Sequence, residues 1–167
     1  MYKHNLIYVV LAAVLSVFCC YANAKSPQIG DMAPDIESCE FSLKQAKGKI
    51  VVLYFYPKDN TVNCTIQSKQ FANKFDDFKT LGIDVVGVSS DSHESHTNFR
   101  KKYNIPFALI CDEDKKLITA YDADGFIWPQ RVTFLIDREG KIAYIWRQIK
   151  VSQHAEEVLN KIKELNL

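Results

Sequence analysis

The feature that most limits the fold of this chain is an apolar run at positions 50–56, Ile-Val-Val-Leu-Tyr-Phe-Tyr. The run is rich in β-branched and aromatic residues and ends at Pro57, a pattern typical of a strand buried on both faces of a sheet. Strands of this kind occur mainly in α/β proteins, where helices cover both faces. The run therefore predicts the central strand of an α/β fold.

The segments after this run alternate between strand-like and helix-like patterns. Phe71, Phe75 and Phe78 have the i, i+4, i+7 spacing of a helix that ends near residues 81–82. Further strands are expected at residues 83–89, 107–110, 132–136 and 141–149, and further helices at residues 92–103, 113–121 and 152–165. A hairpin loop at residues 137–140 makes the last strand antiparallel. This order predicts a mixed sheet with helices on both faces and with functional loops at the carboxyl ends of its parallel strands, such as the loop after residue 56.

Residues 1–24 are predicted to be a cleaved secretory signal peptide, and residues 25–167 a single folded domain. Lys3 precedes an apolar run, and the triplet Ala-Asn-Ala at 22–24 is typical of a cleavage site. The apolar run is too short to span a bilayer comfortably. Acylation of Cys19 or Cys20, as in a lipoprotein, is the alternative, but bulky residues precede both cysteines. The chain is therefore expected to be exported to a bacterial periplasm, without a membrane anchor after cleavage.

The chain has five cysteines, an odd number. Removal of Cys19 and Cys20 with the signal leaves Cys39, Cys64 and Cys111, again an odd number. At least one thiol must then be free, reactive or paired with another molecule. A free thiol is unusual in an oxidising compartment, so it calls for a functional reason.

Cys64 is the cysteine best placed to react. It follows the polar loop at residues 58–63 and lies at or in the first turn of the helix that carries Phe71. Unpaired backbone N–H groups and the positive end of the helix dipole gather there, and both favour the thiolate over the thiol. The hydroxyl of Thr61 can donate to the thiolate or to a bound oxygen. The alternative is a small, buried and inert cysteine.

The spacing Pro57-x-x-x-Thr61-x-x-Cys64 resembles the active-site signature of the peroxiredoxins, most closely that of their bacterioferritin comigratory protein, or Q-type, branch. The resemblance extends over nearly all of residues 25–167. Several stretches occur in the family's order: Ala-Pro-Asp at 33–35, Gly-Lys-Ile-Val-Val-Leu-Tyr-Phe-Tyr-Pro-Lys-Asp at 48–59, Gly-Val-Ser-Ser-Asp-Ser at 87–92, Arg-Val-Thr-Phe-Leu-Ile-Asp at 131–137 and His-Ala-Glu-Glu-Val-Leu at 154–159.

The resemblance implies a thioredoxin-like fold and a thiol-dependent peroxidase that reduces hydrogen peroxide and organic hydroperoxides in antioxidant defence. It makes Cys64 the peroxidatic nucleophile, Thr61 the residue that positions the peroxide, and Arg131 the residue that lies against the thiolate, while Pro57 fixes the loop. The cysteine becomes a sulfenic acid, which a thioredoxin-like protein or a small thiol reduces, and no metal or organic cofactor is needed. Arg131 offers fixed donors that never deprotonate, although an exposed arginine at a strand end is the alternative.

Two positions depart from the family pattern. Lys69 stands where many Q-type members carry a resolving cysteine, so resolution must use Cys111, Cys39, a second subunit or an external thiol. Gln67 stands where the family usually has glutamate, and it can still accept a hydrogen bond from Arg131 but brings no charge.

The sequence supports less specific interpretations of three histidines and two aromatic residues. His93 and His96 are spaced as half a metal site, but the expected interpretation is a solvated helix start capped by Asp91 or Ser92. His154 opens the last helix without a visible partner. Phe126 and Trp128 line the mouth of the site or cap the core.

Two other functions stay open at this point. A dithiol–disulfide oxidoreductase would need a second cysteine three residues after Cys64, where Gln67 stands. A non-catalytic or redox-sensing binding protein would keep the fold without the activity. The balance of 21 basic and 20 acidic residues excludes bulk nucleic-acid affinity, and a monomer or weak dimer is expected.

Overall fold

The computed structural model describes residues 26–167. The predicted signal peptide, with Cys19 and Cys20, lies outside these residues and stays a prediction. The strands are β1 (Ile50–Phe55), β2 (Ile83–Ser89), β3 (Ala108–Cys111), β4 (Val132–Ile136) and β5 (Ile142–Trp146). The helices are α2 (Val62–Asn73), α3 (Phe75–Thr80), α4 (His93–Tyr103), α5 (Lys116–Ala120) and α6 (His154–Glu164). Within the described residues, no helix is long and apolar enough to cross a membrane.

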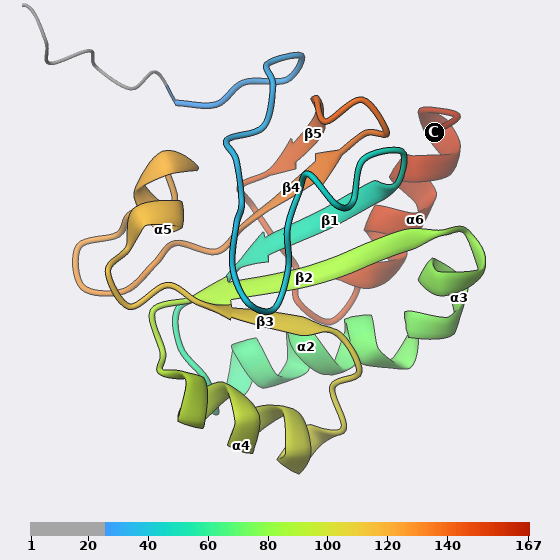
Figure 1. The fold of residues 1–167 in the computed structure, drawn as a ribbon. Coiled ribbons are helices and arrows are strands. Elements are labelled where there is room, and N and C mark those ends of the chain that lie inside the picture. Colours follow the sequence, from blue (N-terminus) through green and yellow to red (C-terminus); the bar gives the residue numbers. More distant parts are fainter. Residues whose placement is uncertain (1–25) are drawn as a thin grey trace, which may run out of the picture.

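The strands form one five-stranded mixed sheet in the order β3-β2-β1-β4-β5, with β1 at its centre (Figure 1). β1 pairs in parallel with β2, and β2 with β3, while β4 is antiparallel to β1 and β5 is antiparallel to β4. Every residue of β1 is buried, as the apolar sequence predicts. The predicted thioredoxin-like α/β fold is therefore confirmed.

One strand direction differs from the sequence-based prediction, which reversed only the last strand. β4 already runs antiparallel to β1, because the chain between β3 and β4 contains only the short α5 and turns and makes no crossover. The chain therefore enters β4 at the edge of the sheet where β1 ends, and Phe55 faces Val132 in the register. Arg131, one residue before β4, is thereby brought to the same edge as the loop after β1.

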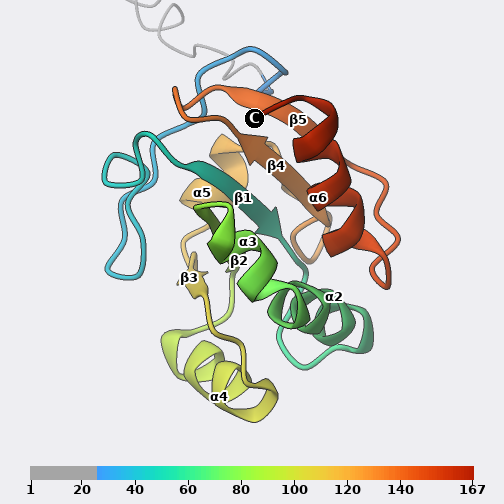
Figure 2. The ribbon, with the colours of Figure 1, turned by 90° about the vertical axis from the view of Figure 1, so that its right-hand side faces the viewer.

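Each face of the sheet carries its own apolar layer. Alternate residues of β1, such as Val52 and Tyr54, pack with α2, α3, α4 and α6, while Val51 and Leu53 pack with α5 and the segment before β1. Figure 2 shows α3 and α6 in front of the sheet and α5 behind it. The predicted helical cover on both faces is confirmed, with the N-terminal segment completing the second layer.

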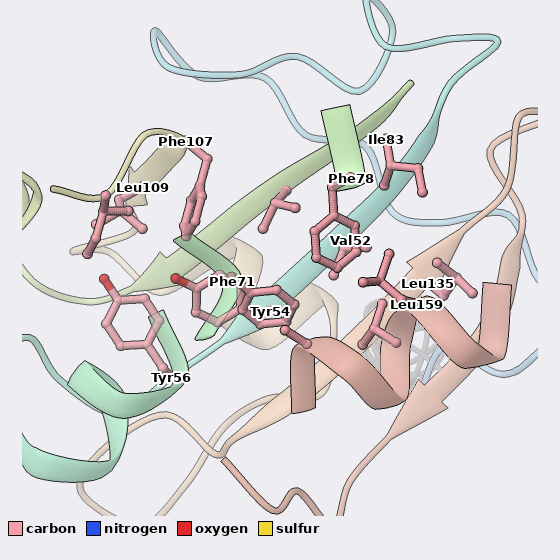
Figure 3. Packing of buried hydrophobic residues seen from close by; sticks show 14 of the residues in the cluster. Val52, Tyr54, Tyr56, Phe71, Phe78, Ile83, Phe107, Leu109, Leu135 and Leu159 are labelled. Carbon is pink, nitrogen blue, oxygen red and sulfur yellow. The ribbon is translucent and has the colours of Figure 1, made fainter. Parts of the chain in front are cut away.

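The core beneath the β1–α2 loop is aromatic. The Tyr54 ring stacks on Phe71 with the centroids 5.0 Å apart and on Tyr56 at 5.5 Å (Figure 3). Gly87 lies against this cluster, because a Cβ there would be 2.6 Å from Leu109 Cδ2 and 2.8 Å from Tyr54 Cζ. A side chain on Gly87 would therefore displace the residues that support the loop.

Several helix and strand boundaries differ from those predicted from the sequence. The helix predicted through Phe71 and Phe78 is divided at Lys74, whose φ of −104° and ψ of 9° are not helical. The predicted helix at 113–121 shortens to α5, because Lys115 has a left-handed φ of 57° and the Asp112 carboxylate caps the N–H groups that follow it. The predicted strand at 141–149 ends at Trp146.

Candidate active site

Cys64 is the third residue of α2, directly after the loop that leaves β1. Only 1% of its surface is exposed, and it belongs to the apolar cluster beneath α2. Burial alone would fit an inert cysteine, so its polar contacts decide what the sulfur can do.

Arg131 makes the decisive contact. Its Nη2 donates to Cys64 Sγ at 3.2 Å, and its Nη1 donates to Gln67 Oε1 at 2.5 Å. Among residues 26–167, Arg131 forms no ion pair with a carboxylate. The positive charge of its guanidinium is therefore available to stabilise a thiolate at Cys64. Gln67 is fully buried, and its Nε2 has no hydrogen-bond partner within the described part of the chain. The guanidinium is held by one turn of α2, between residues 64 and 67.

Thr61 occupies the N-cap position of α2, but its side chain does not cap the helix. The hydroxyl instead donates to the carbonyl of Lys58 at 3.0 Å. The hydroxyl proton is therefore not directed at the thiolate, in contrast to the expectation from sequence, and the Thr61 oxygen is left as an acceptor. The first-turn N–H groups of α2, including that of Cys64, are left without a side-chain cap.

Exposed apolar side chains occur close in the chain to both Cys64 and Arg131. Val62, Phe126, Ile127 and Trp128 are exposed, Phe126 completely, so the predicted alternative of core-capping aromatics is wrong. The ammonium of Lys58 lies 4.7 Å from the centre of the Trp128 ring, which ties the loop before α2 to the loop before β4. We call Val62, Phe126, Ile127 and Trp128 the apolar rim.

Comparison with known proteins identifies the family. Residues 22–145 match the family model "AhpC/TSA family". Peroxiredoxin Bcp from Bacillus subtilis is 38% identical over 152 residues, which are 83% of this chain and 97% of that protein. The chain belongs to the peroxiredoxin family.

Two further relatives support this membership of the Bcp and Q-type branch. Chloroplastic peroxiredoxin Q from Sedum lineare is 38% identical over 135 residues, 78% of this chain and 73% of that protein. The solved structure of a peroxiredoxin Q mutant from Xylella fastidiosa is 34% identical with a TM-score of 0.78, and covers 86% of this chain and 99% of its own. This chain is thus a thiol peroxidase, an enzyme that reduces peroxides with electrons from thiols.

The three cysteines of the described residues are free thiols in this peroxiredoxin. Cys111, half-buried at the end of β3, donates to the Asp91 carbonyl at 3.0 Å. Burial and the nearby Glu113 carboxylate raise the pKa of Cys111 to about 11. Cys39 is exposed, and the neighbouring Glu40 raises the pKa of its thiol. Both thiols are therefore less nucleophilic at neutral pH than an ordinary cysteine.

The prediction of a solvated helix start at His93 and His96 holds for only one of the two. His93 is exposed and contacts Glu40, and Ser92 caps α4 by accepting from the Ser95 N–H. His96 is buried, with 2% of its surface exposed, and contacts Asp59. It shares the inner face of α4 with Phe99, three residues on, and this spacing is the sequence signal that could have placed it inside. Within residues 26–167, no group of three or more histidines, cysteines or acids could hold a metal ion.

His154, which has no visible partner in the sequence, does have partners in the structure. It is fully buried, with Nε2 2.9 Å from Thr133 Oγ1 on β4 and Nδ1 3.4 Å from Glu157. Burial lowers the pKa of His154 to about 4, against a smaller opposing effect of Glu157. The residue is therefore a neutral imidazole at neutral pH, and its partner Thr133 on β4 lies two residues after Arg131.

Proposed function

We propose that Cys64 is the peroxidatic nucleophile and that Arg131 and Thr61 act on the peroxide beside it. The Cys64 thiolate attacks the terminal oxygen of a hydroperoxide, an S–O bond forms, and the O–O bond breaks. The cysteine becomes a sulfenic acid, and the departing alkoxide or hydroxide takes a proton from water. The Arg131 contact with Cys64 Sγ, at 3.2 Å, is the observation that carries this assignment.

The surrounding donors suit the charge that develops. Negative charge moves from the sulfur to the departing oxygen, and fixed donors lower the barrier by stabilising it there. Arg131 and the uncapped N–H groups of α2 supply such donors. The Thr61 hydroxyl donates its hydrogen bond to the Lys58 carbonyl, so its oxygen would accept the hydrogen bond from the O–H of the hydroperoxide. Thr61 thus orients the substrate as a hydrogen-bond acceptor and does not donate to it.

The test is peroxide consumption by Cys64→Ser, with Cys111→Ser as the matched control. Cys64→Ser should lose turnover of hydrogen peroxide and cumene hydroperoxide in the presence of dithiothreitol. Cys111→Ser should keep the rate of the unmodified protein. Undiminished turnover in Cys64→Ser would falsify the assignment and favour a binding role for the fold.

We also propose that the sulfenic acid is resolved by an external thiol of the thioredoxin-like or small-molecule kind. Cys39 and Cys111 both sit beside carboxylates that raise their pKa values, and the Cys111 S–H is engaged with the Asp91 carbonyl. After one equivalent of peroxide, mass spectrometry should find sulfenic acid on Cys64 in the absence of added thiol. A Cys64–Cys39 or Cys64–Cys111 bridge would show internal resolution instead.

We propose that the apolar rim favours hydroperoxides with an apolar tail. Its exposed side chains lie at the first residue of α2, two residues before Cys64, and on the loop that precedes Arg131. A solved bacterioferritin comigratory protein from Xanthomonas campestris, 35% identical with a TM-score of 0.71 over 74% of this chain and 84% of its own, is described for its alkyl peroxide reduction activity. Phe126→Ser should lower the rate with cumene hydroperoxide more than the rate with hydrogen peroxide. The control Leu81→Ser, at an exposed leucine outside the rim, should change neither.

We propose, finally, that residues 1–24 direct export and are removed. The charged start, the apolar run and the Ala-Asn-Ala triplet support this proposal. Mass spectrometry of the protein recovered from the bacterial periplasm should give a chain that begins at Lys25. An acylated Cys19 or Cys20 at the mature N-terminus would show the lipoprotein alternative instead.

A further inference from the structure

A buried polar pair, Asp59 and His96, joins the loop that precedes Cys64 to helix α4. Asp59 has 5% of its surface exposed and His96 2%, although both are ionisable. His96 Nδ1 is 2.9 Å from Asp59 Oδ2, and the peroxide chemistry described above uses neither residue. Ionisable groups are rarely buried unless they are paired, so this pair requires an explanation.

The partners of the imidazole fix its protonation state. His96 Nε2 lies 3.1 Å from the carbonyl oxygen of Ile110, which can only accept a hydrogen bond, so Nε2 carries a proton. Nδ1 faces the Asp59 carboxylate, which is also an acceptor, so Nδ1 carries a proton as well. Both ring nitrogens are therefore donors, and the ring is an imidazolium.

The groups around the imidazolium agree with this assignment. Burial alone would lower the pKa of His96, but the hydrogen bond and charge of Asp59, followed by the Ile110 carbonyl and the charge of Asp91, raise it overall. Asp59 Oδ2 also accepts from Ser95 at 2.7 Å, and Asp59 Oδ1 accepts from the Tyr56 hydroxyl at 2.8 Å. Asp59 belongs to the loop, Asp91 to the turn after β2, and Tyr56 directly follows β1. β3 contributes the Ile110 carbonyl, and its titratable Cys111 thiol donates to the main-chain carbonyl of Asp91.

The same pair fixes the backbone of the loop that precedes Cys64. The Asp59 N–H donates to Asp91 Oδ2 at 2.9 Å, so both the main chain and the side chain of Asp59 are anchored. Asn60 follows in the left-handed region, with φ of 60°, and Thr61 is then the N-cap residue of α2. Through Asp59, helix α4 therefore sets where Thr61 and Cys64 lie relative to Arg131.

We propose that His96 is a positioning residue of the peroxidase reaction: as an imidazolium paired with Asp59, it holds the loop that presents Thr61 and Cys64, and the reaction slows when it loses its proton. A neutral ring would leave a nitrogen lone pair against a carboxylate or carbonyl oxygen, and the contact would open. Displacement of reacting groups by about 1 Å costs up to roughly 100-fold in rate. The proposal rests on Cys64 as the reacting thiol, which Cys64→Ser tests separately.

The first experiment uses the unmodified protein. The ¹⁵N chemical shifts of the His96 ring should show two protonated nitrogens at neutral pH, and the ring should lose a proton only above the ordinary range of histidine. The rate of Cys64 oxidation by hydrogen peroxide, measured by stopped flow, should decline on the alkaline side with the same midpoint. A neutral His96 ring at neutral pH, or a rate that does not follow its titration, would overturn the proposal without any variant.

The second experiment compares His96→Asn with His93→Asn, the same substitution on the exposed face of α4. His96→Asn should react roughly 10-fold to 100-fold more slowly at neutral pH and should lack the alkaline decline, whereas His93→Asn should match the unmodified protein. The double variant Asp59→Asn/His96→Asn replaces the ion pair with two amides that can hydrogen-bond to each other. It should recover part of the rate lost in His96→Asn and still lack the decline. An alkaline decline that persists in His96→Asn would overturn the proposal.

Discussion

Protonation of His154 should make the folded protein lose stability in mild acid. The folded state holds His154 neutral, with a pKa lowered by burial to about 4 from the ordinary 6.5. In the unfolded chain, His154 therefore binds a proton near its ordinary pKa. In the folded chain it stays neutral until the pH is far lower. Stability is fully present above pH about 6.5 and is lost as the pH falls toward about 4, because the unfolded state then binds more protons.

The size of this loss follows from the two pKa values. At about 1.4 kcal/mol per pH unit, the full difference is about 3 kcal/mol, of which about 2 kcal/mol appears between about pH 7.5 and about pH 5. Urea unfolding of the unmodified protein and of His154→Asn at both pH values measures it. The stability advantage of the unmodified protein over His154→Asn should shrink by about 2 kcal/mol in acid, with other titrating groups cancelling in the difference. An advantage that stays constant across this range would refute the assignment of a neutral buried imidazole.

Three further substitutions test other parts of the structure. Arg131→Lys should slow oxidation of Cys64 by peroxide on the order of 100-fold in stopped flow, because one ammonium cannot bridge Gln67 and Cys64 as the guanidinium does; an unchanged rate would contradict the role given to the bridge. Gly87→Ala should lower the free energy of unfolding by about 1–3 kcal/mol in urea titrations, because the new methyl group would meet Leu109 and Tyr54. Ser92→Ala should cost about 1 kcal/mol in the same assay, through loss of the cap at Ser95 N–H, and an unaffected midpoint would show that the cap does not stabilise α4.

The sequence predicts most of the fold because its strands are strongly patterned. The fully apolar run of β1 and the hairpin at 137–140 follow from local rules, and both are present. The direction of β4 does not follow from local rules, because it depends on whether the segment after β3 crosses the sheet, and α5 is too short to make such a crossover. Helix interruptions such as that at Lys74 are similarly set by packing, here of Phe75 and Phe78 against different neighbours.

Some features of the candidate site can likewise be predicted from the sequence, and others depend on the fold. The position of Cys64 in the first turn of α2 follows from the spacing in the sequence, whereas the partner of His96 does not, since Asp59 is 37 residues away along the chain. His96 and His154 are polar residues on otherwise apolar helix faces, and only the fold shows which groups satisfy them. The direction of the Thr61 hydroxyl is likewise a matter of a single local turn, which no periodicity encodes.

The antiparallel course of β4 also bears on when the protein acquires its reactivity during folding. Arg131 and Cys64 are 67 residues apart in the chain, and they meet only because β4 pairs with the carboxyl end of β1. Pairing at this sequence separation closes a long loop and comes late relative to local helix formation. Until β1 and β4 have paired, Cys64 lacks the contact with Arg131 on which the proposed reaction depends, so we expect its reactivity with peroxide to appear only when these strands have paired.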